Sequence, residues 1–116
     1  MQGGFKSLIV WQKSVALAKE VYTLTGLLPT RENYALADQM RRAAVSIPSN
    51  IAEGSRRTSK KDYRHFIAVA HGSLSELETQ AIIAQELYPE IPFAKLEPLI
   101  AEISRMLHVL ALRLRD

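Results

Sequence analysis

Apolar residues recur at three- and four-residue spacing in four separate stretches of the chain, which is the spacing of a helix face. They predict helices over about residues 8–28, 31–54, 60–87 and 94–114. No stretch alternates apolar and polar residues as a half-buried strand does. Because short connections make successive helices antiparallel neighbours, we expect one all-α domain, residues 1–116, folded as an up-down-up-down four-helix bundle.

Proline, glycine and serine residues mark where these helices begin, bend and end. Pro29 cannot continue a helix, so it closes the first one. Pro48 falls inside the second helix, where the missing N–H predicts a kink. Gly54 is a good C-terminal stop for that helix. Ser59 and Asp62 have the spacing of a capping box, so they predict the start of the third helix.

The first predicted helix carries two apolar stripes. A helix on the outside of a lone bundle needs only one. Two stripes therefore suggest that the second one contacts another subunit, although a single broad core face is the alternative. The stripe assigned to the oligomer interface is Val10, Leu17, Val21 and Leu24. The other stripe is Leu8, Trp11, Val15, Ala18 and Tyr22.

Composition narrows the class of protein. The chain has 116 residues and 47% apolar residues, enough for one globular domain with its own core. It has no cysteine, which excludes disulfides, thiolate zinc sites and cysteine nucleophiles. No apolar run approaches the ~20 residues that span a bilayer, and the N-terminus lacks the pattern of a signal peptide. We expect a cytoplasmic protein without a membrane partner.

Positive charge is concentrated in one part of the chain. Between Arg41 and His65 there are seven Lys or Arg residues and two acidic residues, which gives +5, whereas the whole chain carries +3. Such a cluster indicates phosphate contact in a nucleic-acid partner. The alternative is a solvated corner with weak surface ion pairs. The residues concerned are Arg56, Arg57, Lys60, Lys61 and Arg64, with Arg41 and Arg42 roughly 20 Å away along the helix.

A polar stripe on the second helix predicts a structural network. Ser46, Asn50 and Glu53 share one helix face, and Glu76 and Glu78 of the third helix could face them. Buried charges need partners, so we interpret these five residues as an inter-helix or inter-subunit network that fixes register. A polar site inside the bundle is the alternative.

Signals for catalysis and cofactors are missing from the sequence. A di-iron site in a helical bundle needs two Glu-x-x-His pairs, and the nearest match is one Asp62 to His65 spacing among cationic neighbours. The five glycines are scattered rather than gathered in a phosphate-binding loop. No serine lies in a nucleophile-elbow pattern. We therefore expect no enzyme activity, metal, cofactor or small-molecule substrate.

Several motifs occur together and in order along the first three quarters of the chain. They are Leu8–Lys13, Tyr34–Ala44, Ser46–Gly54, Phe66, Ala70 and Gly72–Thr79. On these residues the chain resembles the four-helix-bundle family of proteins encoded in intervening sequences of 23S ribosomal RNA. The resemblance implies a barrel-like homopentamer without established catalytic activity. It also implies similarity to accessory proteins of diversity-generating retroelements, which are associated with a reverse transcriptase and with nucleic acid.

Together these features predict a non-enzymatic, oligomeric helical bundle that binds RNA or structured DNA through a basic end. Aromatic residues are few near the basic cluster, so recognition should be mainly of phosphate and shape. The alternative is a protein-interaction scaffold, or an accessory subunit for a nucleic-acid-handling partner such as a reverse transcriptase. A purely structural oligomer is the third possibility.

Overall fold

The computed structural model describes residues 4–115, and their regular structure is entirely helical. Four long α-helices are accompanied by three short 3₁₀ turns. In chain order the elements are η1 (Gly4–Ser7), α1 (Ile9–Thr25), η2 (Thr30–Glu32), α2 (Leu36–Ser55), α3 (Lys60–Leu87), η3 (Phe93–Leu96) and α4 (Glu97–Arg113). The all-α class expected from the sequence is confirmed.

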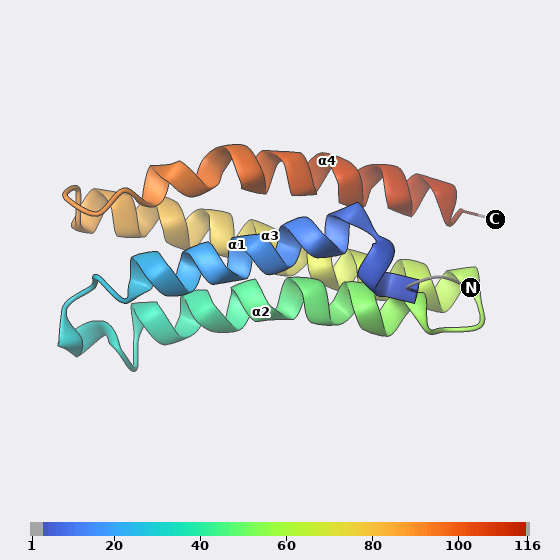
Figure 1. The fold of residues 1–116 in the computed structure, drawn as a ribbon, viewed down its shortest axis with the longest axis horizontal. Helices are drawn as coiled ribbons and strands as arrows, with labels where there is room; N and C mark the ends of the chain where they lie inside the picture. Colours follow the sequence, from blue (N-terminus) through green and yellow to red (C-terminus); the bar gives the residue numbers. More distant parts are fainter. Residues whose placement is uncertain (1–3, 116) are drawn as a thin grey trace.

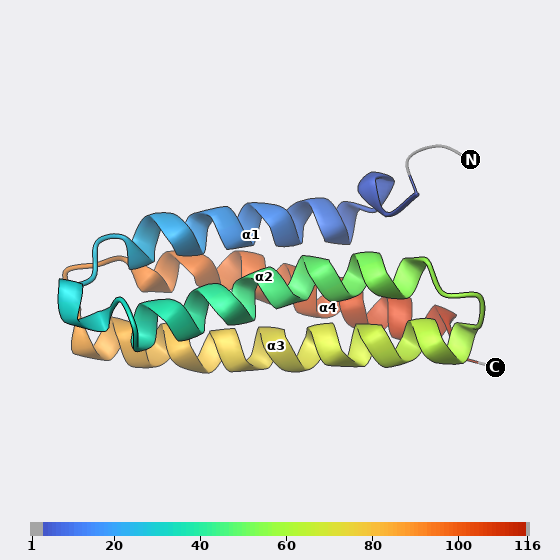
Figure 2. The same ribbon diagram turned by 90° about the horizontal axis from the view of Figure 1, so that it is seen from below.

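The four helices lie side by side along the long axis of a rod measuring 45 × 20 × 20 Å (Figures 1 and 2). Helix α1 packs against α2 and α4, and α3 packs against the same two helices. One end of the rod, which we call the α2–α3 end, holds the loop between those helices, η1 and the last turn of α4 (Figure 1). The opposite end, which we call the α3–α4 end, holds the loop between α1 and α2 and the loop between α3 and α4.

A continuous apolar core fills the space between the helices. The largest fully buried side chains come from all four helices and from η3, for example Leu17, Met40, Leu77, Phe93 and Ile103. Burial of each such side chain contributes about 1.5–3 kcal/mol relative to exposure. The core therefore extends over the whole rod and joins all four helices.

The stripe of α1 assigned to an oligomer interface lies in this core instead. Val10, Leu17, Val21 and Leu24 are at most 7% exposed within a single chain. They cannot contact another subunit without unfolding the bundle, so that assignment is wrong. The other stripe is the partly exposed one: Trp11, Val15 and Ala18 are half-buried, and Tyr22 is 50% exposed.

Helix boundaries agree closely with the sequence prediction where a local signal sets them. Helix α3 has the predicted bounds, and its start is set by the Ser59 hydroxyl, which accepts a hydrogen bond from the Asp62 N–H over 3.1 Å. Helix α1 ends at Thr25, earlier than expected, and α2 and α4 are each preceded by a 3₁₀ turn where the prediction already placed α-helix. Helix α2 continues through Pro48 without interruption.

Two helical glycines differ in their surroundings, and one of them has a role different from the one expected. Gly54 does not end α2, which continues to Ser55, but allows α3 to approach closely. A Cβ atom on Gly54 would lie 2.9 Å from Phe66 Cβ and 3.0 Å from Tyr63 Cδ1. Gly72, in the middle of α3, faces open space, because a Cβ atom there would meet no atom within 4 Å.

Candidate nucleic-acid interface

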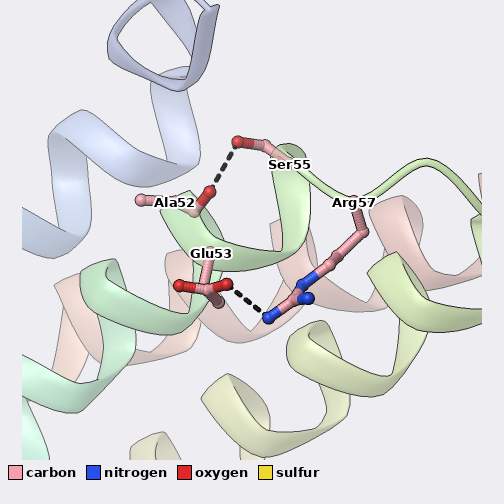
Figure 3. A network of polar contacts seen from close by, with 4 residues as sticks. All are labelled: Ala52, Glu53, Ser55 and Arg57. Carbon is pink, nitrogen blue, oxygen red and sulfur yellow. Dashed lines mark hydrogen bonds and ion pairs between the residues drawn. The ribbon is translucent and has the colours of Figure 1, made fainter.

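The turn between α2 and α3 is held by short-range hydrogen bonds. The Ser55 hydroxyl donates to the Ala52 carbonyl over 2.8 Å, which satisfies a carbonyl at the end of α2 (Figure 3). Tyr63 packs against Gly54, and this burial raises the pKa of its phenol. The turn is therefore a defined corner that projects charged residues in fixed directions at the α2–α3 end.

The two arginines of the turn already have partners within the chain. Arg57 forms an ion pair with Glu53 one helical turn earlier (Figure 3) and stacks over the ring of Phe66 at 4.7 Å. Arg56 lies over the ring of Phe5, at 5.0 Å from its centroid. Both arginines are exposed despite these contacts, so they remain accessible to a phosphate while the rings restrict their motion.

Lys60 and Lys61 are the least engaged cations of the corner. Both are exposed, and neither forms an ion pair with any residue between 4 and 115. They occupy the first turn of α3. The N-terminus of a helix carries partial positive charge, so two lysines there disfavour folding slightly and reinforce an anion-attracting site.

The fold adds cations from both ends of the chain to this corner. The Arg64 guanidinium donates a hydrogen bond to the Leu114 carbonyl over 2.8 Å, which fixes the end of α4 beside the start of α3. We define the basic end by the eight described cations that gather at this end of the rod. Among the described residues, only Glu53 and Asp62 add negative charge at the same end. The eight cations are Lys6, Arg56, Arg57, Lys60, Lys61, Arg64, Arg113 and Arg115.

Three members of this set, Lys6, Arg113 and Arg115, were missing from the sequence interpretation. They lie far from the Arg56–Arg64 segment in sequence. The only signal was the predicted topology itself: in a bundle of four successive antiparallel helices, both chain termini lie at the end that holds the second connection. Arg64, Arg115 and His108 line an open depression at this end.

Arg41 and Arg42 do not belong to the basic end. The Arg41 guanidinium donates to the Thr25 hydroxyl over 2.9 Å and lies over the ring of Tyr22. Arg42 pairs with Asp38 at 3.0 Å. Both lie in the first half of α2, towards the α3–α4 end, so the structure assigns them contacts with α1 and within α2.

The predicted polar network is only partly present. The Ser46 and Ser73 hydroxyls are 2.8 Å apart and link α2 to α3, and the Asn50 amide donates to the Ser46 carbonyl over 2.8 Å. Glu53 pairs with Arg57 instead. Glu76 lines an open surface depression together with Ser46 and Ser73, and it forms no ion pair with any described residue. Glu78 lies on the α4 side of α3, outside this network.

We also searched the described residues for a metal site and for a membrane-spanning helix. Residues 4–115 contain no group of three or more histidine, aspartate or glutamate side chains placed to hold a metal ion. No helix among them combines the length and apolar character needed to cross a membrane. The basic end is therefore the strongest candidate site, and its chemistry is that of an anion-binding surface.

Comparison with curated proteins found no match. The family model described as 23S rRNA-intervening sequence protein matches residues 6–109, which includes all four α-helices up to the last turns of α4. The chain therefore belongs to the family of 23S rRNA-intervening sequence proteins.

Proposed function

We propose that this protein is a cytoplasmic, non-enzymatic homo-oligomer that binds RNA or structured DNA through the basic end, mainly by phosphate contacts. The convergence of three chain segments carries this proposal. The start of the chain, the α2–α3 corner and the end of α4 each contribute cations to one end of the rod. If the cations were no more than the solvated surface of a helix turn, they would be confined to the α2–α3 corner.

The five cations that the α2–α3 corner contributes to the basic end form two groups with different tasks. Arg56, Arg57 and Arg64 are held by rings, a carboxylate or a backbone carbonyl, so their positions are fixed before any ligand arrives. Lys60 and Lys61 are exposed and form no ion pair with a described residue, so their long, flexible side chains can follow a phosphate backbone. A fixed arginine frame with flexible lysines favours recognition of backbone shape over base sequence.

Oligomerisation is proposed through the groove between α1 and α2. This groove is lined mainly by apolar atoms, with Val15, Ala18 and Tyr22 from α1 and Val45 and Pro48 from α2. A contiguous apolar surface of this kind is typical of a protein interface. In a ring such as the homopentamer implied by the resemblance, the basic ends would gather around one axis and their positive potentials would add.

The test is fluorescence-anisotropy binding to a structured RNA and to duplex DNA over a salt series. The Lys60→Gln/Lys61→Gln variant is compared with Lys95→Gln/Arg105→Gln, which removes the same charge away from the basic end. On duplex DNA each phosphate contact contributes about −0.9 to the log–log salt slope, so losing two contacts flattens it by about 1.8.

The lysine variant is a clean probe because removal of positive charge from the first turn of α3 does not weaken the helix. We expect weaker binding for it and unchanged binding for the control. Equal binding by both variants would contradict the proposal, as would no binding by the wild type at low salt.

A protein-interaction scaffold is the second candidate function, because most arginines of the basic end already hold partners within the chain. In that case the same surface would accept the carboxylates of an acidic protein, or of a partner that itself handles nucleic acid. Capture of an acidic protein by the wild type, together with absent RNA and DNA binding, would favour this candidate.

A further inference from the structure

A small pocket lies at the α3–α4 end of the rod, away from the basic end. It is bounded by the last turns of α3, by η3 and by the start of α4, and its volume is about 180 Å³. Its floor is apolar and belongs to the core: Ala81, Phe93 and Ile100 are all buried. The exposed side chain of Ile82 extends this apolar surface outward.

Hydrogen bonds within the chain shape this pocket in advance. The Gln85 amide oxygen accepts from the Ala94 N–H over 2.7 Å, and its amide nitrogen donates to the Pro89 carbonyl over 3.3 Å. Both ends of the Gln85 side chain are thus used to hold the α3–α4 loop against α3. A ligand would therefore meet a formed pocket, without the entropic cost of ordering a loop.

Carboxylates surround the opening. Glu78, Glu86 and Glu97 all line it, and none of the three forms an ion pair with any residue from 4 to 115. They do not form a metal-binding group either, within the same residues. Local negative charge around an apolar floor is complementary to an apolar side chain flanked by cations.

The size of the pocket decides between kinds of ligand. Sites for small molecules and cofactors usually measure about 300–1,000 Å³, which is larger than the 180 Å³ found here. One large apolar side chain is a better match. On a helix, residues three and four positions from such a side chain lie about 5–6 Å away, which places lysines or arginines there opposite the carboxylates.

We propose that this acid-rimmed pocket docks a basic amphipathic helix of a protein partner. One leucine-sized side chain enters between Phe93 and Ile82, and neighbouring cations pair with Glu78, Glu86 and Glu97. This is the helix-in-groove mode of recognition, with a single apolar anchor and an electrostatic rim. The site is independent of the basic end, which lies at the other end of the rod.

The experiment uses a fluorescein-labelled helical peptide of about 18 residues, roughly five turns, with one central leucine as the anchor, lysines three and four positions to either side of it, and alanines elsewhere. A matched peptide carries glutamate in place of every lysine. We expect the basic peptide to bind the full-length protein and the acidic peptide to bind at least about tenfold more weakly, with the difference shrinking as salt rises. The protein's net charge of +3 disfavours binding of a basic peptide. Preference for that peptide would therefore reflect the local negative charge around the pocket.

Two pairs of variants localise the site. Ile82→Ser should weaken binding of the basic peptide by about tenfold, whereas Ile83→Ser should not, because Ile83 is similarly exposed (46% against 50%) but does not line the pocket. Glu86→Gln/Glu97→Gln should weaken it by about fivefold or more. Glu76→Gln/Glu90→Gln removes the same charge outside the pocket and should leave binding unchanged.

Equal effects of each variant and its control would overturn the proposal, and so would a lack of peptide binding at low salt. RNA binding is measured on the same four variants. Because none of them alters the basic end, it should not change, which separates failure of this site from failure of the proposed nucleic-acid surface.

Discussion

Arg64 of α3 donates a hydrogen bond over 2.8 Å to the backbone carbonyl of Leu114, fifty residues further along the chain. The Leu114 side chain is buried, so this bond and the apolar contact together hold the end of α4 against the bundle. The bond also brings Arg113 and Arg115 to the α2–α3 corner. A single arginine thus has both a structural and an electrostatic role at the basic end.

Arg64→Ala should loosen the last turn of α4. Loss of a hydrogen bond from a charged group costs about 1.5–3 kcal/mol when the groups are buried, and less here because Arg64 is half-buried. We expect faster amide hydrogen exchange at the end of α4, measured by NMR. His65→Ala, at the adjacent exposed position, is the control and should leave exchange there unchanged.

Alanine at two glycines should shift stability in opposite directions. Gly54→Ala places a methyl group 2.9 Å from Phe66 Cβ, and such overpacking costs about 1–3 kcal/mol. Gly72→Ala meets no atom within 4 Å and gains about 0.5–1 kcal/mol from higher helix propensity. Urea unfolding followed by circular dichroism measures both, and a stabilised Gly54→Ala would show that α2 and α3 are not in close contact there.

Charged substitutions on adjacent residues of α1 should separate core from interface. Val21 is fully buried, so Val21→Glu should unfold the bundle, since an unpaired charge in the core is strongly unfavourable. Tyr22→Glu, at a position that is 50% exposed, should keep the helix content but lower the oligomer mass. Circular dichroism and light scattering give the two readings, and an unchanged mass for Tyr22→Glu would remove the α1–α2 groove as the proposed contact.

Tyr88 should make the protein less stable at alkaline pH. Its hydroxyl donates a hydrogen bond to Glu32, and this bond, followed by burial, raises the Tyr88 pKa above the ordinary 10.0. The folded state therefore holds the proton more tightly than the unfolded chain. The contribution is fully present below the ordinary pKa and is lost as pH rises through the higher folded pKa.

Urea midpoints at pH values from about 8 to 11.5 should consequently fall less steeply for Tyr88→Phe than for the wild type. Tyr34→Phe is the matched control, since Tyr34 is 97% exposed. If the two variants follow the same curve, the Tyr88–Glu32 hydrogen bond does not persist in solution.

Local chemistry made much of this fold predictable. The Ser59 hydroxyl and the Asp62 N–H lie three residues apart, so the start of α3 could be read from the sequence alone. The sequence alone could not show which of the two stripes of α1 is buried in the core, because Val21 and Tyr22 are both apolar and adjacent. Which of them faces the core depends on where α2 and α4 pack, and that is a property of the whole bundle.

In the candidate site too, residues marked by a local sequence signal were predictable, and residues placed by the topology were not. Lys60 and Lys61 were identifiable because they lie in one dense run of charge. Arg113 and Arg115 were not, because their place depends on the topology and on the bond from Arg64 to Leu114. The pairing of Arg57 with Glu53 did not follow from the sequence interpretation for another reason. That interpretation places Glu53 in a network across helices, whereas its partner Arg57 lies only four residues further along the chain.

The rod is 45 Å long and electrically polar, with the basic end at one extremity and the acid-rimmed pocket towards the other. Beside a polyanion such a molecule experiences a torque that turns it end-on, because one extremity is attracted and the other repelled. On the proposed nucleic-acid ligand it would stand upright with the pocket directed outward. A second protein bound there would be held at a distance set by the length of the bundle, without competing for the same phosphates.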